Sequence, residues 1–143
     1  MIPFYPKVSE LTLAMRPKLH PLFQQLGEGI SEFTFANLYL FRTTHNYFIS
    51  QLSDNLLLIG GEDAGSLFFM LPFGLPEPSI LEKLFQQYGV MKCVSQSQAE
   101  DLQTMGYAIV EDRKNFDYLY QRRDLTELSG RKFHKKRNLI KAF

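Results

Sequence analysis

Three short hydrophobic runs between Tyr47 and Leu71 constrain the fold of this 143-residue chain more than any other feature. Turn-forming residues follow the first run, and a polar, glycine-rich connection at residues 60–65 precedes the third. Strands joined by connections this short pair antiparallel, so the pattern predicts a three-stranded meander with Gly60 and Gly61 in a hairpin turn. The predicted strands are residues 47–52, 56–59 and 66–71.

Helices are predicted before and after this meander. A stripe of leucines with Phe23, between residues 19 and 26, predicts one helix, and Ser31 is the predicted N-cap of another that ends at Arg42. The second helix is apolar nearly all round, which predicts burial on more than one side or cover by a partner or a second domain. The other predicted elements are a short strand at residues 7–8, a helix at 78–88, a strand at 90–95, a helix at 96–105, a last strand at 107–111 and a helix at 131–143.

Positive charge is concentrated at the end of the sequence. Residues 122–143 contain eight basic and two acidic side chains, a net charge of +6, and the remaining residues carry a net charge of −5. Asp124 is the predicted N-cap of a short helix at residues 125–128. On a helical wheel, residues 131–143 combine a basic face with an apolar stripe formed by Phe133, Leu139, Ile140 and Phe143. This skew predicts an anionic partner, although a solvated helix face accounts for the same charges equally well.

The sequence lacks the motifs of several common kinds of functional site. The three histidines, His20, His45 and His134, show no HxxxH spacing and there is no CxxC pair, so no metal site is predicted. P-loop, GxGxxG and GxSxG patterns are also missing from the sequence. The single cysteine, Cys93, rules out an internal disulfide, and we expect it in the core of a protein from the reduced cytoplasm. No run approaches the roughly 20 apolar residues of a membrane span, and no signal-peptide layout begins the sequence.

The order of the predicted elements resembles the Gcn5-related N-acetyltransferase fold. The resemblance implies an α/β (α+β) chain with a mixed sheet that contains the antiparallel meander, flanking helices and a C-terminal basic linker helix. In ordinary members, the amides of a glycine-rich loop before the central helix hold the diphosphate of coenzyme A. Here the loop is residues 72–78, which contain three prolines without N–H groups and Glu77, whose charge repels an anion. We therefore expect no coenzyme A site, and no other cofactor, in this half.

Three segments resemble a more specific family. They are residues 31–42, the Asp-Tyr-Leu-Tyr segment at residues 117–120, and residues 128–140, which contain Gly-Arg-Lys-Phe-His-Lys-Lys-Arg-Asn. Together they resemble the phosphatidylglycerol lysyltransferase C-terminal-like family, which is related to Fem-type peptidyltransferases. Proteins of this family carry two acetyltransferase-like halves joined by the basic helix. The resemblance implies an N-terminal half-domain at residues 1–123 and a basic helix at residues 124–143 that leads to a second half absent from this chain.

Characterised relatives in that family transfer an aminoacyl group from tRNA to a lipid or a peptide amine. The resemblance therefore implies one half of a tandem acyl- or aminoacyl-transferase, which becomes an enzyme when a second half completes it. Lys135, Lys136, Arg137 and Asn138 would bind an anionic substrate, whether tRNA, a lipid headgroup or a carrier phosphate.

Asp117, Tyr118 and Tyr120 would line the cleft between the halves, and a structural role for the aromatic pair is equally compatible with the sequence. No catalytic residue is predicted. The alternative function is a non-catalytic binding or regulatory module that keeps the fold. In that case a homodimer, in place of a second half, could bury the apolar stripe of the last helix.

Overall fold

The computed structural model describes residues 1–27, 29–117 and 120–143. These residues form two compact units, unit 1 at residues 1–110 and unit 2 at residues 111–143. Tyr118, one of the predicted cleft residues, lies outside the described residues. In the part of the chain that is described, no helix combines the length and the hydropathy of a membrane span.

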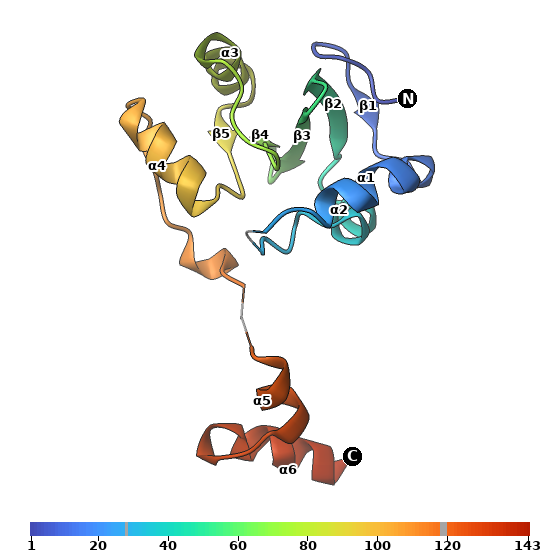
Figure 1. The fold of residues 1–143 in the computed structure, drawn as a ribbon, viewed down its shortest axis with the longest axis vertical. Helices are drawn as coiled ribbons and strands as arrows, with labels where there is room; N and C mark the ends of the chain where they lie inside the picture. The colour runs from blue at the N-terminus through green and yellow to red at the C-terminus, as the bar shows by residue number, and fades with distance from the viewer. Residues whose placement is uncertain (28, 118–119) are drawn as a thin grey trace. The chain divides into compact units, whose positions relative to one another are not determined.

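Unit 1 is built on a mixed sheet whose strands follow the order β1-β2-β3-β4-β5 (Figure 1). The first four strands pair antiparallel, and β5 pairs with β4 in parallel. A parallel pair needs a crossover, which the helix α3 (Pro78–Tyr88) provides. The strands are β1 (Ser9–Glu10), β2 (Phe48–Ser53), β3 (Leu56–Asp63), β4 (Ser66–Met70) and β5 (Val90–Met91). The predicted α+β class, with an antiparallel meander in a mixed sheet, is confirmed.

Helices cover both faces of the sheet because its central strands are apolar on both faces. Along β3, Leu57 and Ile59 pack into the core with α1 and α2, whereas Leu58 packs into the core with α3 and α4. This alternation is the two-residue period of a strand, and it explains why the run reads as continuously apolar. The helices are α1 (Arg16–Phe23), which follows a 3-10 turn at Leu13–Met15, α2 (Phe35–Phe41), α3 and α4 (Gln96–Thr104).

Gly60 and Gly61 lie within β3, so the prediction that they form the hairpin turn was wrong. The turn follows the end of β3, at Ala64 and Gly65, which both have positive φ. A Cβ added to Gly60 would lie 2.0 Å from Cζ of Phe48, and one added to Gly61 would lie 2.8 Å from the carbonyl oxygen of His45. The two glycines are therefore required by side chains and backbone that close over the middle of β3, and not by turn geometry.

The predicted last strand at residues 107–111 is also wrong, since these residues form no strand. The ring of Tyr107 instead stacks on Phe85 of α3, with 4.4 Å between the ring centroids, and the residues that follow are exposed. The predicted strand at residues 90–95 ends early, at Met91, because Cys93 adopts a positive φ of 54° that an extended strand does not allow.

The second predicted helix begins later than Ser31. Thr34 is the N-cap of α2, and its hydroxyl accepts a hydrogen bond from the amide of Asn37 at 3.1 Å. The Asn37 side chain donates to the carbonyl of Ser31 at 3.2 Å, which ties the preceding turn to the helix. Leu38 is fully buried, whereas Leu40 is 71% exposed, so within unit 1 the helix is buried on one side only.

Replacing Gly60 with alanine is expected to destabilise the protein by about 1–3 kcal/mol, because Phe48 or the β3 backbone must move to admit the methyl group. Urea denaturation measures the loss. Gly27→Ala is the matched control, since a Cβ there meets nothing within 4 Å. Adding Phe48→Leu to Gly60→Ala should restore part of the stability, and strictly additive losses would contradict this account.

Candidate anion-binding site

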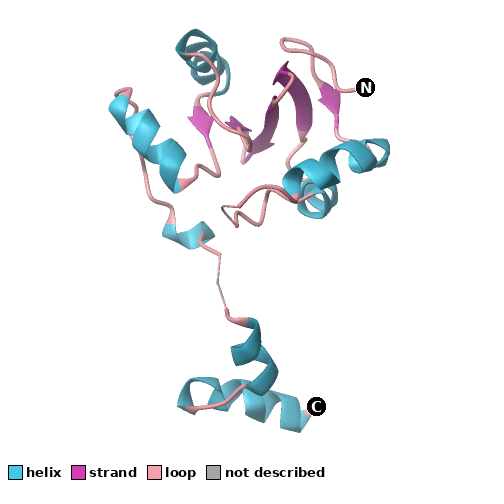
Figure 2. Cartoon of the chain, in the orientation of Figure 1, coloured by secondary structure: helices cyan, strands magenta, loops and turns pink. Residues whose placement is uncertain are grey.

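The described residues of unit 2 form helices and loops with no strand (Figure 2). A 3-10 turn at Arg113–Asn115 comes first, and α5 (Arg122–Glu127) follows. The predicted final helix begins with a 3-10 turn at Arg131–Phe133 and continues as α6 (His134–Ala142). Phe133 is 4% exposed and is the buried side chain of this segment.

Arg137 fixes α6 against the turn that connects it to α5. In this turn Leu128 adopts the left-handed conformation and donates its amide to the carbonyl of Asp124 at 2.9 Å, and Gly130 has a φ of 84°. The Arg137 guanidinium donates to the carbonyl of Leu128, and to the carbonyl of Gly130 at 2.8 Å. Two carbonyls that follow α5 thus receive charge-assisted hydrogen bonds, which are stronger than neutral ones.

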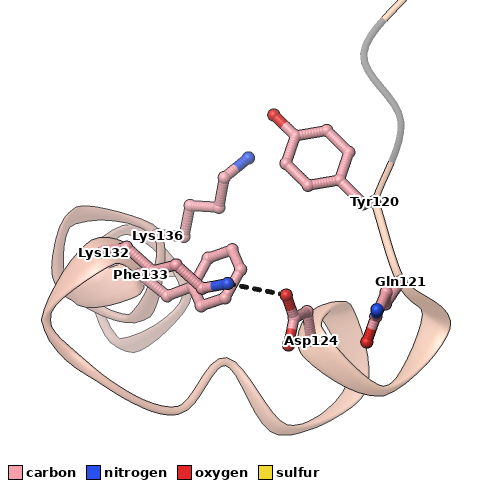
Figure 3. Close-up of a pocket in the computed structure, with 6 residues that line it drawn as sticks. All are labelled: Tyr120, Gln121, Asp124, Lys132, Phe133 and Lys136. Carbon is pink, nitrogen blue, oxygen red and sulfur yellow. Dashed lines mark hydrogen bonds and ion pairs between the residues drawn. The ribbon is translucent and has the colours of Figure 1, made fainter.

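A hollow of about 640 Å³ opens between the start of α5 and the start of α6 (Figure 3). Lys136 extends toward the ring of Tyr120, with 5.3 Å between its ammonium nitrogen and the ring centroid. Lys132 reaches the carboxylate of Asp124 at 2.7 Å and lies 4.8 Å from the centroid of the Phe133 ring. The residues that line the hollow are Tyr120, Gln121, Asp124, Lys132, Phe133 and Lys136.

Asp124 does not cap a helix at residues 125–128, which corrects that prediction. The helix begins earlier, with Gln121 at the N-cap, and Asp124 lies in its first turn. Its carboxylate accepts a hydrogen bond from Lys132, which holds it beside the hollow, and it does not cap the helix. A carboxylate in the first turn still interacts favourably with the helix dipole.

The acidic side chains of residues 122–143 are both engaged in ion pairs. Besides the pair of Asp124 with Lys132, Glu127 binds Arg123 at 3.0 Å. Helix α6 itself has no acidic residue, and Lys135 and Lys136 are exposed on it. The positive charge of these lysines is therefore not neutralised within their own helix, and it favours anions in the surrounding solvent.

The described residues of the predicted site do not gather in one place. Lys136 and Tyr120 meet at the hollow, whereas Lys135 and Arg137 line a second, smaller hollow together with Arg131 and His134. Asn138 lies 3.2 Å from Nε2 of His134 through its side-chain amide. Asp117 is exposed.

The sequence did not identify Gln121, Asp124, Lys132 and Phe133 as residues that line the hollow. A signal for Lys132 was present, since the helical wheel places Lys132 and Lys136 together within the apolar arc of the last helix. Gln121 and Asp124 gave no signal. They lie at the start of α5, and only the turn after α5 brings that end of the helix close to the start of α6.

A second polar cluster lies in unit 1, beside β3 and β5. The Lys92 ammonium, 2.6 Å from the carboxylate of Asp63, donates a hydrogen bond that lowers the pKa of that carboxyl. Tyr47 is 7% exposed, and its burial, together with the nearby Cys93 and Glu32, raises its pKa to about 12. Tyr47 therefore keeps its proton at neutral pH and cannot act as a base there.

Cys93, which the sequence predicted in the core, is half-buried and packs against the edge of the core that contains Tyr47. Among the described residues, no three His, Cys, Asp or Glu side chains lie close enough together to hold a metal ion.

Comparison with known proteins gives one family and one solved structure. A family model described as phosphatidylglycerol lysyltransferase, C-terminal, matches residues 23–143. A crystal structure of a conserved protein of unknown function from Bacteroides thetaiotaomicron is similar, with 27% sequence identity and a TM-score of 0.76. The match covers 99% of this chain and 50% of that one, so this chain spans about half the length of the solved protein. A search of curated proteins found no match.

Replacing Arg137 with glutamine is expected to lower the free energy of local opening at residues 128–130 by about 1–3 kcal/mol, because two carbonyls lose a charged donor. Amide hydrogen exchange across residues 128–142 measures this as faster local opening. Lys141→Gln removes one charge from the same helix and is the control, for which we expect unchanged exchange. Equal exchange in both variants would show that Arg137 does not hold the turn.

Tyr47→Phe is expected to reduce the sensitivity of the fold to alkali. Because the folded pKa of Tyr47 is raised above its ordinary value of 10.0, the stabilising effect of the protonated phenol is complete below pH 10 and is lost as pH rises toward 12. The free energy of unfolding of the wild type should therefore fall more steeply between pH 9 and 12 than that of the variant. Parallel pH profiles would contradict the assignment.

Proposed function

Because the chain belongs to the phosphatidylglycerol lysyltransferase C-terminal family, we propose that it is one half of a tandem acyl- or aminoacyl-transferase whose unit 2 binds the anionic substrate. In this proposal residues 1–123 are an acetyltransferase-like half-domain, and residues 124–143 lead to a second half. The solved relative supports this arrangement, since its chain is about twice as long as the part that matches. The cytoplasm remains the proposed compartment.

The observation that carries the proposal is the uncompensated charge of α6. Lys135 and Lys136 are exposed on a helix without acidic residues, while the two carboxylates nearest in sequence already bind other cations. We assign the phosphate contacts of the substrate to these two lysines, with Asn138 beside them and Tyr120 and Asp117 at the edge. A phosphate group on any of the proposed substrates, tRNA, lipid headgroup or carrier, provides the same chemistry.

Arg137 has a different role in this proposal from the one that the family motif implied. Its guanidinium already donates to the carbonyls of Leu128 and Gly130. We therefore propose that Arg137 positions the helix that carries Lys135 and Lys136, and that its remaining donors add to the attraction for the anion.

We also propose that unit 1 holds no coenzyme A, so the donor site belongs to the second half. In the loop at residues 72–78, Pro72 and Pro76 are buried and have no N–H to offer. At the start of α3, the amides of Ile80 and Leu81 both donate to the carbonyl of Glu77. The side chain of Gln98 donates to the carbonyl of Leu71 at 2.8 Å, so this carbonyl at the end of β4 already has a partner inside the protein.

The same loop favours the second candidate, a non-catalytic binding or regulatory module. Incubation of the chain with acyl-coenzyme A or aminoacyl-tRNA, and with phosphatidylglycerol or amine acceptors, separates the two. Transfer that requires a supplied second half supports the proposed function. Anion binding with no product at any concentration, with or without a second half, supports the binding module.

Replacing both Lys135 and Lys136 with glutamine should weaken binding of phosphate-bearing ligands and reduce its salt dependence. With a short RNA acceptor stem as the probe, the slope of log K against log salt is expected to become shallower by about 1.4–1.8, because two phosphate contacts are lost. The glycerophosphoglycerol headgroup is the second probe, so the two sources of phosphate are distinguished. Lys141→Gln is the control, and an unchanged slope in the double variant would reject the assignment.

A further inference from the structure

Two lysines line the hollow of unit 2, and one of them is already bound to a carboxylate (Figure 3). Lys132, in the 3-10 turn, and Lys136, in α6, are four positions apart, so their side chains are neighbours on one face of the helical segment. The Lys132 ammonium lies 2.7 Å from the Asp124 carboxylate, whereas the Lys136 ammonium lies 5.3 Å from the centroid of the Tyr120 ring. The hollow thus combines two positive charges with one negative charge.

Asp124 offsets the repulsion between these two lysines. Like charges four positions apart on a helix are destabilising, and a carboxylate that pairs with one of them reduces that cost. Asp124 is the acidic residue among those that line the hollow, and its side chain is 33% exposed, against 67% for the side chain of Lys132. The carboxylate therefore occupies, beside Lys132, the place of an anion from solution.

We propose that Asp124 is a resting counter-ion for Lys132, which a phosphate group of the substrate displaces. On displacement, Lys132 turns from the carboxylate to the phosphate and becomes a third lysine contact beside Lys135 and Lys136. The inference rests on the proposed function for the anionic substrate, and it deepens that function by assigning a further binding residue and a competing carboxylate to the same site.

The exchange needs little rearrangement. Exposed ion pairs are weak, and the pair is open to solvent on its lysine side, so the carboxylate is a modest competitor. A lysine ammonium is a compact charge on a flexible four-carbon stem, which lets it change partners without movement of the backbone. Phe133, whose ring centroid lies 4.8 Å from the Lys132 ammonium, is buried and anchors the 3-10 turn during the exchange.

Glu127 provides a natural contrast to Asp124. It pairs with Arg123 at 3.0 Å within α5, and it does not line the hollow. The two carboxylates carry the same charge and each binds one cation, so they differ in whether the ion pair borders the hollow. Glu127→Gln is therefore the matched control for Asp124→Asn, because each variant removes one carboxylate and releases one cation.

Replacing Asp124 with asparagine should tighten binding of phosphate, because Lys132 is then free to bind it from the start. In the wild type, the cation that the phosphate releases at Lys132 is replaced by one that Asp124 takes up, so this contact adds nothing to the salt dependence. With the full chain and the short RNA acceptor stem, Asp124→Asn should raise the affinity about threefold to tenfold and steepen the slope of log K against log salt by about 0.7–0.9, the value of one phosphate contact.

The control variants separate this effect from net charge. Glu127→Gln should change the affinity by less than about twofold and leave the slope unaltered, because Arg123 does not reach the site. Adding Lys132→Gln to Asp124→Asn should return the slope to the wild-type value. The glycerophosphoglycerol headgroup is measured in parallel, and the probe whose affinity Asp124→Asn raises more identifies the source of the phosphate.

Equal gains with Asp124→Asn and Glu127→Gln would indicate a general effect of net charge and would overturn the inference, while the proposed anion site would stand. Weaker binding with Asp124→Asn, in a variant whose amide hydrogen exchange shows unit 2 folded, would overturn it in favour of a carboxylate that only positions Lys132. The expected gains without transfer in any mixture would leave this inference standing and would count against the proposed transferase instead.

Carbon-13 NMR of the side-chain carboxyl groups gives a direct readout in the unaltered protein. Titration with the RNA should move the Asp124 resonance, as its carboxylate loses Lys132, while the Glu127 resonance stays in place. An Asp124 resonance that is unchanged at saturation would contradict displacement.

Discussion

The close packing of aromatic rings and backbone over β3 is the constraint on which unit 1 depends. β3 is paired on both edges and covered on both faces, so it can yield space in no direction. Glycine at positions 60 and 61 lets Phe48 pack on one face and Tyr47 and Phe68 on the other. The packing of both cores of unit 1 against β3 therefore depends on two residues that have no side chain.

Unit 2 is organised by charge more than by a large core. Its turn is closed by Arg137, its hollow is bordered by the Lys132 and Asp124 pair, and its apolar anchor is Phe133. Ion pairs at exposed positions contribute little to stability, so the turn depends mainly on the hydrogen bonds of the guanidinium to two carbonyls. The exposed lysines of α6 take no part in the core, so a binding surface built on them, as proposed above, would cost the fold little.

The sequence predicted those parts of the fold that follow from local periodicity. The meander, α3 and α4 were placed correctly because their apolar spacing and caps lie within a few residues of one another. Gly60 and Gly61 were misplaced because the rings that require them come from other strands, which a local pattern does not reveal. The strand predicted at residues 107–111 failed for a similar reason, since the stacking of Tyr107 on Phe85 is a tertiary contact.

The candidate site was predictable to a smaller extent. Lys136 and Tyr120 were both named from the sequence, and their meeting at one hollow follows from the turn between α5 and α6. The helical wheel gave a signal for Lys132, but its pairing with Asp124 could not be predicted, because the two residues are eight positions apart on separate elements. The bonds of Arg137 to main-chain carbonyls also leave no trace in composition or spacing.

Arg137 sets the orientation of α6, whereas the exposed lysines set the electrostatic attraction of the helix for anions. Arginine keeps its charge at every pH that a protein tolerates, and its bonds to Leu128 and Gly130 fix the rotational setting of the helix about its own axis. Salt, in contrast, acts on the exposed lysines, whose fields extend into solvent. Changes in ionic strength would thus alter how strongly the helix attracts anions, while the direction in which its lysines point would stay the same.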